Sequence, residues 1–558
     1  MNAAATTSKG LDRDSLDMLL HSLKEFQKTR LPESTLLDLD ARDEFPEETV
    51  RALGTELGIQ MLFISEEYGG MGGNAFDVYR LCEALARVDV GVATGVLATF
   101  LGSDPIAFGG TQEQKQLWLG RIASEGILMA YGATEPQAGS DLAALLSTAE
   151  RIMEDGNIKG YKLNGTKQWI SNGGYADVYT FLANTPNGPS WFVIERDAPG
   201  LSNGETEDKH GIRASNTATV TCEDVVVDTD RLVGGTEGQG LLQAQMVFGY
   251  TRLMVAAFGL GAGWEALDRA IAYSKERIQK GGPLSEKQGY TLKLIVPHAV
   301  ALEAGRAYIE ATAERIDAGT EGALNTEGAI AKYLSTEAGH AAADAAIQAL
   351  GGYGYTREYM VEKISRDVRI TRIYEGTSEI MEMTISRDRW QDHLKTRGQH
   401  YHNLAKELSA LHQRHPYVGA DVAALAHHAL AEALERTRIG RLTRHQHVQL
   451  RLGALTAAVE GAGVLAKRAA MAERGELNEK ADKRFGVQGL AAVSRVYARK
   501  TALNIAMEAL HWVIGAGGVS ESERKAFESA LMLSEIFGAQ SGLMEDMERV
   551  ANVLYERA

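Results

Sequence analysis

The chain has 558 residues, far more than one hydrophobic core supports, so three or four domains or subdomains are expected. Hydrophobic residues make up 44% and charged residues 24%, which is typical of a folded globular protein, and the formal net charge of −16 argues against a nucleic-acid binder. The cysteines Cys82 and Cys222 lie far apart without CxxC spacing, which excludes a disulfide framework and a cysteine zinc site.

The elements expected along the chain fall into four parts. Residues 1–130 show apolar residues three and four positions apart, which indicates helices. Residues 131–240 carry short β-branched and aromatic runs separated by Gly, Asn, Pro and Asp, the pattern of antiparallel strands and turns. Helical periodicity returns over residues 241–390 and again over residues 391–558. The predicted fold class is therefore α+β, mostly α.

The location of the protein is predicted from what the sequence does not contain. No stretch reaches the ~18 uncharged apolar residues that cross a bilayer. The N-terminus lacks a basic-then-apolar signal pattern, and Asp12, Asp14 and Asp17 come early. We therefore expect a cytoplasmic protein.

The first motif is YGATEPQAGSD, Tyr131–Asp141, where helices give way to strands. Gly139 allows backbone amides to approach a ligand, and Thr134 and Ser140 supply hydroxyl donors. Such a turn suits an anion or the pyrimidine edge of a flavin. A polar loop between domains is an equally good interpretation of the composition alone.

The second motif is KQWISNGG, Lys167–Gly174. Trp169 and Ser171 are two residues apart, so a strand places them on the same face. A flat cofactor would stack on the indole and hydrogen-bond the hydroxyl. Taken alone, a core tryptophan is the more frequent role.

The third motif is RIYEGTSEI, Arg372–Ile380. Glu375 lies beside Tyr374 and Gly376 in an apolar setting, where a carboxylate of raised pKa acts as a general base. A charge at a helix terminus is the plainer alternative. The glycine-rich ALGGYGYTREY, Ala349–Tyr359, follows no predicted strand, so it is a loop between helices and not a dinucleotide fingerprint.

The last part of the chain is rich in histidine, but it contains no HExxH pattern. A metal site needs several such residues to converge with carboxylates. We therefore expect solvated or structural histidines and no metal.

The order and spacing of these motifs, with GYTRLMVAA between the second and the glycine-rich loop, resembles the acyl-CoA dehydrogenase family over roughly residues 15–390. The resemblance implies an N-terminal helical domain, a central antiparallel β domain and a C-terminal four-helix bundle, here followed by an additional helical domain. It also implies FAD as cofactor and oxidation of a saturated acyl-CoA thioester to the trans-2-enoyl-CoA, as in fatty-acid β-oxidation. Electrons would pass to an electron-transferring flavoprotein.

The resemblance also implies roles for individual residues. Glu375 matches the base that removes the α-proton, and Arg252 matches an arginine that supports the active site. Some relatives carry the base beside that arginine, but Gly249 to Thr251 contain no carboxylate. The residues matched to FAD contacts are Tyr131, Thr134, Gly139, Ser140, Trp169, Ser171, Arg277, Gln279, Gln348, Gly352 and Thr377. Those matched to substrate contacts are Ser140, Thr251, Arg252, Tyr374 and Gly376.

The chain departs from the family pattern in two places. Lys280-Gly281 follows Gln279 where Phe-Gly is common, and Gly249 stands where relatives often carry an acidic residue that contacts CoA. Both departures concern ligand contacts and leave the expected chemistry unchanged.

The tail, residues 391–558, resembles in placement the extension of very-long-chain acyl-CoA dehydrogenases. A covalent domain there would cover the surface that joins dimers in tetrameric relatives, so a homodimer is expected. Residues 475–500 combine basic residues with an apolar face, as an interfacial membrane helix does, but an ordinary surface helix is the favoured interpretation.

Three other functions remain open. An acyl-CoA oxidase would pass electrons to oxygen, but such enzymes typically carry EGDN where this chain has EGTS from Glu375 to Ser378. A non-catalytic acyl-CoA-binding protein on the same fold would not need Glu375 and Arg252. Physiological reduction of an enoyl-CoA is the third, because direction depends on the redox partner.

Overall fold

A computed structural model of the protein describes residues 10–319 and 324–557, without the side chains at positions 247 and 248. The chain forms two compact units. The first holds the chain up to Met254 together with Ala313–Asn325 and Arg366–Ile370. The second holds Val255–Thr312, Thr326–Ser365 and everything from Thr371 onward. The predicted four-part division of the chain stays a prediction.

The first unit begins with helices. They are α1 Arg13–Arg30, α2 Glu33–Arg42, α3 Glu47–Thr55, α4 Ile59–Leu62, α5 Ala75–Val88, α6 Val90–Gly109 and α7 Gln112–Glu125. Asn74 and Asp77 form a capping box at the start of α5, and Thr111 and Gln114 form one at the start of α7. These signals explain where the helices begin.

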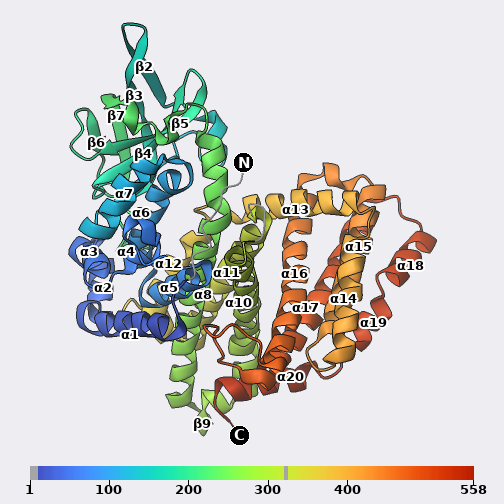
Figure 1. Ribbon diagram of the computed structural model, residues 1–558. Coiled ribbons are helices and arrows are strands. Elements are labelled where there is room, and N and C mark those ends of the chain that lie inside the picture. The colour runs from blue at the N-terminus through green and yellow to red at the C-terminus, as the bar shows by residue number, and fades with distance from the viewer. Residues whose placement is uncertain (1–9, 320–323, 558) are drawn as a thin grey trace. The chain divides into compact units, whose positions relative to one another are not determined.

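A seven-stranded sheet follows the helices (Figure 1). Its strands are β1 Met129–Gly132, β2 Thr148–Glu154, β3 Asn157–Ser171, β4 Val178–Thr185, β5 Gly188–Glu195, β6 Leu201–Asn203 and β7 Thr217–Asp228. The order is β1-β4-β2-β3-β7-β6, with β5 also paired to β4. The prediction of antiparallel strands holds for most pairs, but β4 pairs in parallel with β1 and β2. The α+β, mostly helical class is confirmed.

The expectation that no segment could cross a bilayer needs correction. Among the described residues, the helices α6 and α16 (Gln446–Arg474) are long and apolar enough to cross a membrane, judged by length and composition alone. Of the 18-residue apolar stretch in each helix, 89% is buried inside the protein in α6 and 61% in α16. A helix that is apolar all round packs in the middle of a core, which accounts for the composition of α6.

The second unit is helical. Its longer helices are α8 Gly240–Glu276 (from Val255), α10 Val296–Asp317 (to Thr312), α11 Asn325–Leu350, α12 Met360–Val368 (to Ser365), α13 Ser378–Lys395, α14 His400–Arg414, α15 Ala420–Ile439, α16, α17 Gly486–Gly515, α18 Glu521–Ala530, α19 Leu533–Gly538 and α20 Leu543–Leu554. A hairpin of β8 Ile278–Gln279 and β9 Gly282–Pro283 follows α8. Residues 475–485 separate α16 from α17, and residues 516–520 separate α17 from α18.

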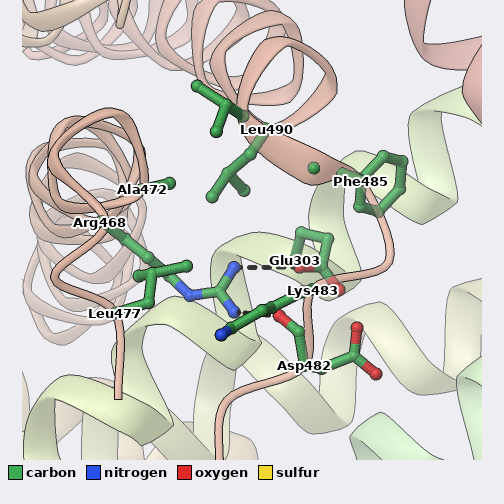
Figure 2. A pocket seen from close by; sticks show the side chains of 11 residues that line it. Glu303, Arg468, Ala472, Leu477, Asp482, Lys483, Phe485 and Leu490 are labelled. Carbon is green, nitrogen blue, oxygen red and sulfur yellow. Dashed lines mark hydrogen bonds and ion pairs between the residues drawn. The ribbon is translucent and has the colours of Figure 1, made fainter. Parts of the chain in front are cut away.

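Buried ion pairs join the helical tail to the helices that precede it. Arg468 of α16 donates to Glu310 at 2.7 Å, to Glu303 at 3.3 Å and to the carbonyl of Asp482 at 2.9 Å. Figure 2 shows Arg468 and Glu303 beside a small cavity of about 150 Å³ that Phe485 also lines. Because breaking such a pair leaves an uncompensated buried charge, these contacts fix the packing of the tail.

The proposed interfacial segment of the tail is not one helix. Residues 475–485 form an irregular connection, and α17 begins at Gly486. Apolar residues of α17 such as Leu490, Val493 and Ile505 are buried, and α17 packs against α15, α16 and α20. The apolar face is therefore covered by protein, as the favoured interpretation required.

Candidate active site

Trp169 lies near the end of β3 on the surface of the first unit. Its side chain is 60% exposed and its φ is +57°, a conformation that costs energy for a bulky residue. The register between β3 and β7 shifts between Lys167 and Ile170, so a bulge turns the indole outward. The interpretation of Trp169 as a core residue is wrong. A large exposed ring on a strained bulge is a ready stacking surface.

The loop that follows β1 lies against this bulge. The backbone N–H of Gln168 donates to the carbonyl of Thr134 at 2.9 Å, so Thr134 and Trp169 belong to adjoining segments. A Cβ at Gly139 would meet only the Thr134 methyl at 3.7 Å, which is ordinary contact. Ser140 is exposed, and the ring of Tyr131 packs on Trp191 with centroids 4.6 Å apart. The structure therefore brings the first two sequence motifs, Tyr131–Asp141 and Lys167–Gly174, next to each other.

A buried ion pair fixes the loop to the strand. Glu135 and Lys167 are almost fully buried, and the Oε1–Nζ distance is 2.7 Å. Glu135 also accepts the backbone N–H groups of Leu146 and Ser147, at 2.6 and 3.0 Å. Burial lowers the pKa of Lys167 to about 8, against the opposing effect of Glu135. Neither residue was predicted from the sequence, although Glu135 stands inside the first motif and Lys167 inside the second.

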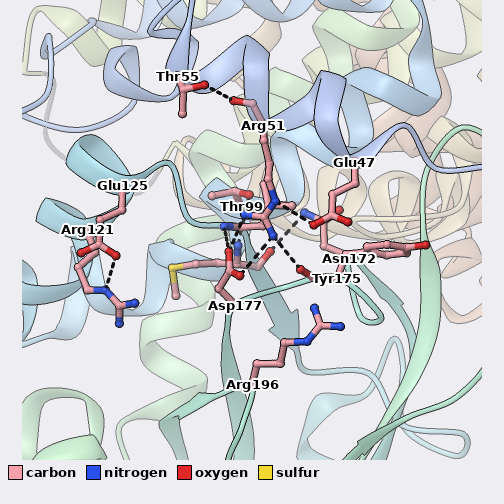
Figure 3. Close-up of polar contacts among 12 residues, drawn as sticks. Glu47, Arg51, Thr55, Thr99, Arg121, Glu125, Asn172, Tyr175, Asp177 and Arg196 are labelled. Atoms are coloured by element: carbon pink, nitrogen blue, oxygen red, sulfur yellow. Dashed lines mark hydrogen bonds and ion pairs between the residues drawn. The ribbon is translucent and has the colours of Figure 1, made fainter.

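The turn after Ser171 is anchored to the helices of the same unit (Figure 3). The buried Asn172, with φ of +60°, donates from Nδ2 to the carbonyl of Gly95 in α6 at 2.9 Å. Arg51 of α3 binds Asp177 at 2.8 Å, and Asp177 accepts the N–H of Leu128 at 2.8 Å. The position of Ser171, at the end of β3, is thereby set.

These residues fit a flavin. A flat aromatic ligand needs a stacking face and hydrogen-bonding groups at its edge. The ring of Trp169 is exposed, Gln168 beside it bonds the carbonyl of Thr134, and Ser171 follows two residues later. Ser171 is half-buried and pairs with Thr217 in the sheet, so its backbone is held.

Arg252 and Thr251 lie in the first unit on α8. Both are buried, and Arg252 Nη1 donates to the side-chain oxygen of Asn325 at 2.5 Å. Asn325 is the first residue of α11. The bond to Asn325 helps to fix the guanidinium, which suits a supporting role.

Glu375 lies in the second unit, two residues before Thr377, the N-cap of α13. Glu375 has φ of +55° and Gly376 has φ of +91°, so the chain makes a left-handed turn at the glutamate. The Thr377 hydroxyl accepts the N–H of Ile380 at 3.3 Å. The alternative of a helix-terminus charge describes its place correctly, but Glu375 is only partly exposed.

Two charged residues of α11 hold the turn around Glu375. The buried Lys332 donates from Nζ to the carbonyl of Gly376. Glu337 accepts from Arg372 at 2.7 Å and from the Ser378 hydroxyl at 2.6 Å, on either side of the turn. Lys332 and Glu337 were not predicted as site residues, because the helix pattern of α11 does not distinguish them from other charged residues.

Four of the residues matched to FAD contacts are exposed in the second unit. Arg277 and Gln279 lie at the end of α8 and in the hairpin, while Gln348 and Gly352 lie at the end of α11 and just after it. Lys280 and Gly281, with φ of +47° and +81°, form the hairpin turn. The departure from Phe-Gly therefore falls at the tip of the turn.

Family models match most of the chain. The acyl-CoA dehydrogenase N-terminal domain matches residues 13–126, the middle domain 130–225 and the C-terminal domain 238–389. An acyl-CoA dehydrogenase of Bacillus subtilis (strain 168) is 34% identical over 378 residues, covering 66% of this chain and 96% of that protein.

Solved structures agree with this. A glutaryl-CoA dehydrogenase of Mycobacterium smegmatis in complex with FADH2 is 28% identical, with a TM-score of 0.63 over 68% of this chain and 95% of its own. A chain in a structure of the electron transferring flavoprotein of Acidaminococcus fermentans is 33% identical, with a TM-score of 0.63 over 68% of this chain and 98% of its own.

A third structure shares the fold of the tail as well. An acyl-CoA dehydrogenase of Bacillus anthracis complexed with FAD is 24% identical and covers 97% of this chain and 95% of its own, with a TM-score of 0.79. On the family models and the Bacillus subtilis relative, the chain belongs to the acyl-CoA dehydrogenase family of enzymes.

Proposed function

We propose that the protein oxidises a saturated acyl-CoA thioester to the trans-2-enoyl-CoA with FAD, and that Glu375 is the base. The observation that carries this proposal is the held left-handed turn at Glu375, with Lys332 bound to the carbonyl of the next residue. Glu337, bonded to Arg372 and to Ser378 on either side of this turn, adds to the contacts that fix its conformation. Arg252 is the supporting residue.

FAD, when bound, supplies the acceptor for the hydride that leaves the β-carbon. Trp169 would stack beside the ring system, and Thr134 and Ser171 would hydrogen-bond its edge. The glutaryl-CoA dehydrogenase relative, crystallised with FADH2, supports this cofactor. Tyr131, Gly139, Ser140, Arg277, Gln279, Gln348, Gly352 and Thr377 complete the proposed set.

The step that the protein's own residues carry out is a proton transfer. The Glu375 carboxylate takes the α-proton of the thioester, and hydrogen bonds to the carbonyl oxygen stabilise the developing enolate. Burial of the acyl chain excludes water and strengthens both effects. Ser140, Thr251, Tyr374 and Gly376 are the proposed substrate contacts, with Arg252.

The proposed electron acceptor is an electron-transferring flavoprotein, which the match to the Acidaminococcus structure supports. The sequence EGTS, which begins with the base Glu375, favours a dehydrogenase over an oxidase. We further propose a cytoplasmic homodimer acting in fatty-acid β-oxidation. Light scattering of the pure protein should give the mass of two chains, and the mass of four would contradict it.

The test is an anaerobic panel of acyl-CoA thioesters of graded length and branching, scored by bleaching of the flavin. At least one saturated thioester should bleach it and yield the trans-2-enoyl product. Turnover should then require an added acceptor. Peroxide formation in air at the rate of turnover would favour an oxidase, and a purified protein that takes up no flavin would favour a non-catalytic role.

A further inference from the structure

The helical tail brings together two histidines and a carboxylate that lie apart in the sequence. His402 lies on α14, and His428 and Glu432 lie on α15, which packs against α14 (Figure 1). One ligand atom from each of the three lies within 4.8 Å of the others. His428 and Glu432 are four residues apart, so both project from the same face of α15. We call these three residues the His402 cluster.

We propose that the His402 cluster binds a divalent transition metal ion of the zinc type. Two imidazoles and one carboxylate form one of the ligand sets of three-ligand zinc sites, which leave one position open. His402 Nε2 lies 3.4 Å from Glu432 Oε1. Two ligands bound tetrahedrally at about 2.0–2.1 Å from zinc lie about 3.3–3.4 Å apart, so this edge already has the required length.

A backbone contact orients the third ligand. His428 Nε2 lies 2.9 Å from the carbonyl oxygen of Ala530, the last residue of α18. A carbonyl only accepts, so Nε2 carries the proton and the lone pair of the neutral ring is on Nδ1. Metal-binding histidines characteristically donate their second N–H to such an oxygen, which fixes both tautomer and ring.

The surroundings allow a small ion to enter. Both histidines line a cavity of about 870 Å³, to which Asp421 and Glu535 also contribute. Lys406 lines the same cavity and would repel a cation, but the carboxylates around it outnumber this one ammonium group. The ion would join α14 to α15, and through Ala530 it would also restrain the end of α18.

The test uses the purified full-length flavoprotein and zinc ions alone. After chelator treatment, equilibrium dialysis with metal analysis should show one saturable zinc ion per chain. His402→Ala, His428→Ala and Glu432→Gln should each weaken binding at least ~10-fold. The matched controls are His445→Ala and His447→Ala, whose side chains are exposed outside the cluster. Both should bind zinc as the unaltered protein does.

Two further measurements distinguish a specific zinc site from nonspecific binding of zinc to the protein surface. Zinc should raise the melting temperature of the unaltered protein and of the controls but not of the cluster variants, because only a specific site stabilises the folded state by mass action. X-ray absorption of the cobalt-substituted protein should report low-coordinate nitrogen and oxygen ligands. Absence of saturable uptake, or equal affinity in the His402→Ala and unaltered proteins, would overturn the proposal.

Discussion

The Nζ of Lys167 lies 2.7 Å from the Oε1 of Glu135, and both side chains are shut off from solvent. Glu135 belongs to the loop that carries Thr134, and Lys167 precedes Trp169 by two residues. One ion pair therefore holds two segments of the proposed flavin site in register. Removing one partner of such a pair leaves the other charge buried without compensation.

Lys167→Met should therefore destabilise the protein by roughly 3–5 kcal/mol, measured by urea unfolding. The double variant Glu135→Gln/Lys167→Met should recover part of that loss, because it removes both charges. If the free energy of unfolding of Lys167→Met lies within ~0.5 kcal/mol of that of the unaltered protein, the ion pair does not hold the loop.

Trp169→Ala tests the stacking surface. The side chain is exposed, so stability without cofactor should change by no more than ~0.5 kcal/mol. FAD affinity should fall about 10-fold, since an aromatic stacking contact contributes up to ~1.5 kcal/mol. Titration of the apoprotein with FAD measures this, and Trp169→Phe should keep most of the affinity. Unchanged FAD binding by Trp169→Ala would remove the indole from the site.

Glu460 in the tail predicts a dependence of stability on pH. Burial raises the pKa of Glu460, but Arg389 and the hydroxyls of Tyr308 and Tyr401 outweigh it and lower the pKa to about 2. The ordinary value is 4.5. The stabilisation, about 3 kcal/mol, is therefore complete above pH 4.5 and is lost as the pH falls toward 2.

Glu460→Gln should consequently be less stable at pH 7 and should lose less further stability on acidification. Urea unfolding at pH 7, 5 and 3.5 measures both effects. Glu407→Gln, at an exposed position, is the matched control and should follow the unaltered protein. If the free energy of unfolding fell equally with pH in Glu460→Gln and in the control, Glu460 would not be the source of the pH dependence.

Much of the fold followed from sequence because its signals are local. Helix periodicity and the strand runs of residues 131–240 are properties of neighbouring residues. The parallel pairing of β4 with β1 and β2 was missed, because strand order depends on contacts between distant segments.

The site was predictable only where its residues stand inside motifs. Glu375, Trp169 and Thr134 were proposed in this way. Lys332 and Glu337 sit on an ordinary helix, and only folding brings them to the turn at Glu375. His402, His428 and Glu432 come together only on folding, because two helices supply them and no single spacing in the sequence marks the group.

The central claim is that Glu375 removes the α-proton, and the rate of flavin reduction in Glu375→Gln tests it most directly. Rapid mixing of the FAD-loaded variant with its best acyl-CoA should show normal cofactor content but reduction at least ~10²-fold slower. Glu379→Gln, on the exposed side of α13, should reduce at the unaltered rate. A Glu375→Gln protein that reduces its flavin at nearly the normal rate would contradict the claim.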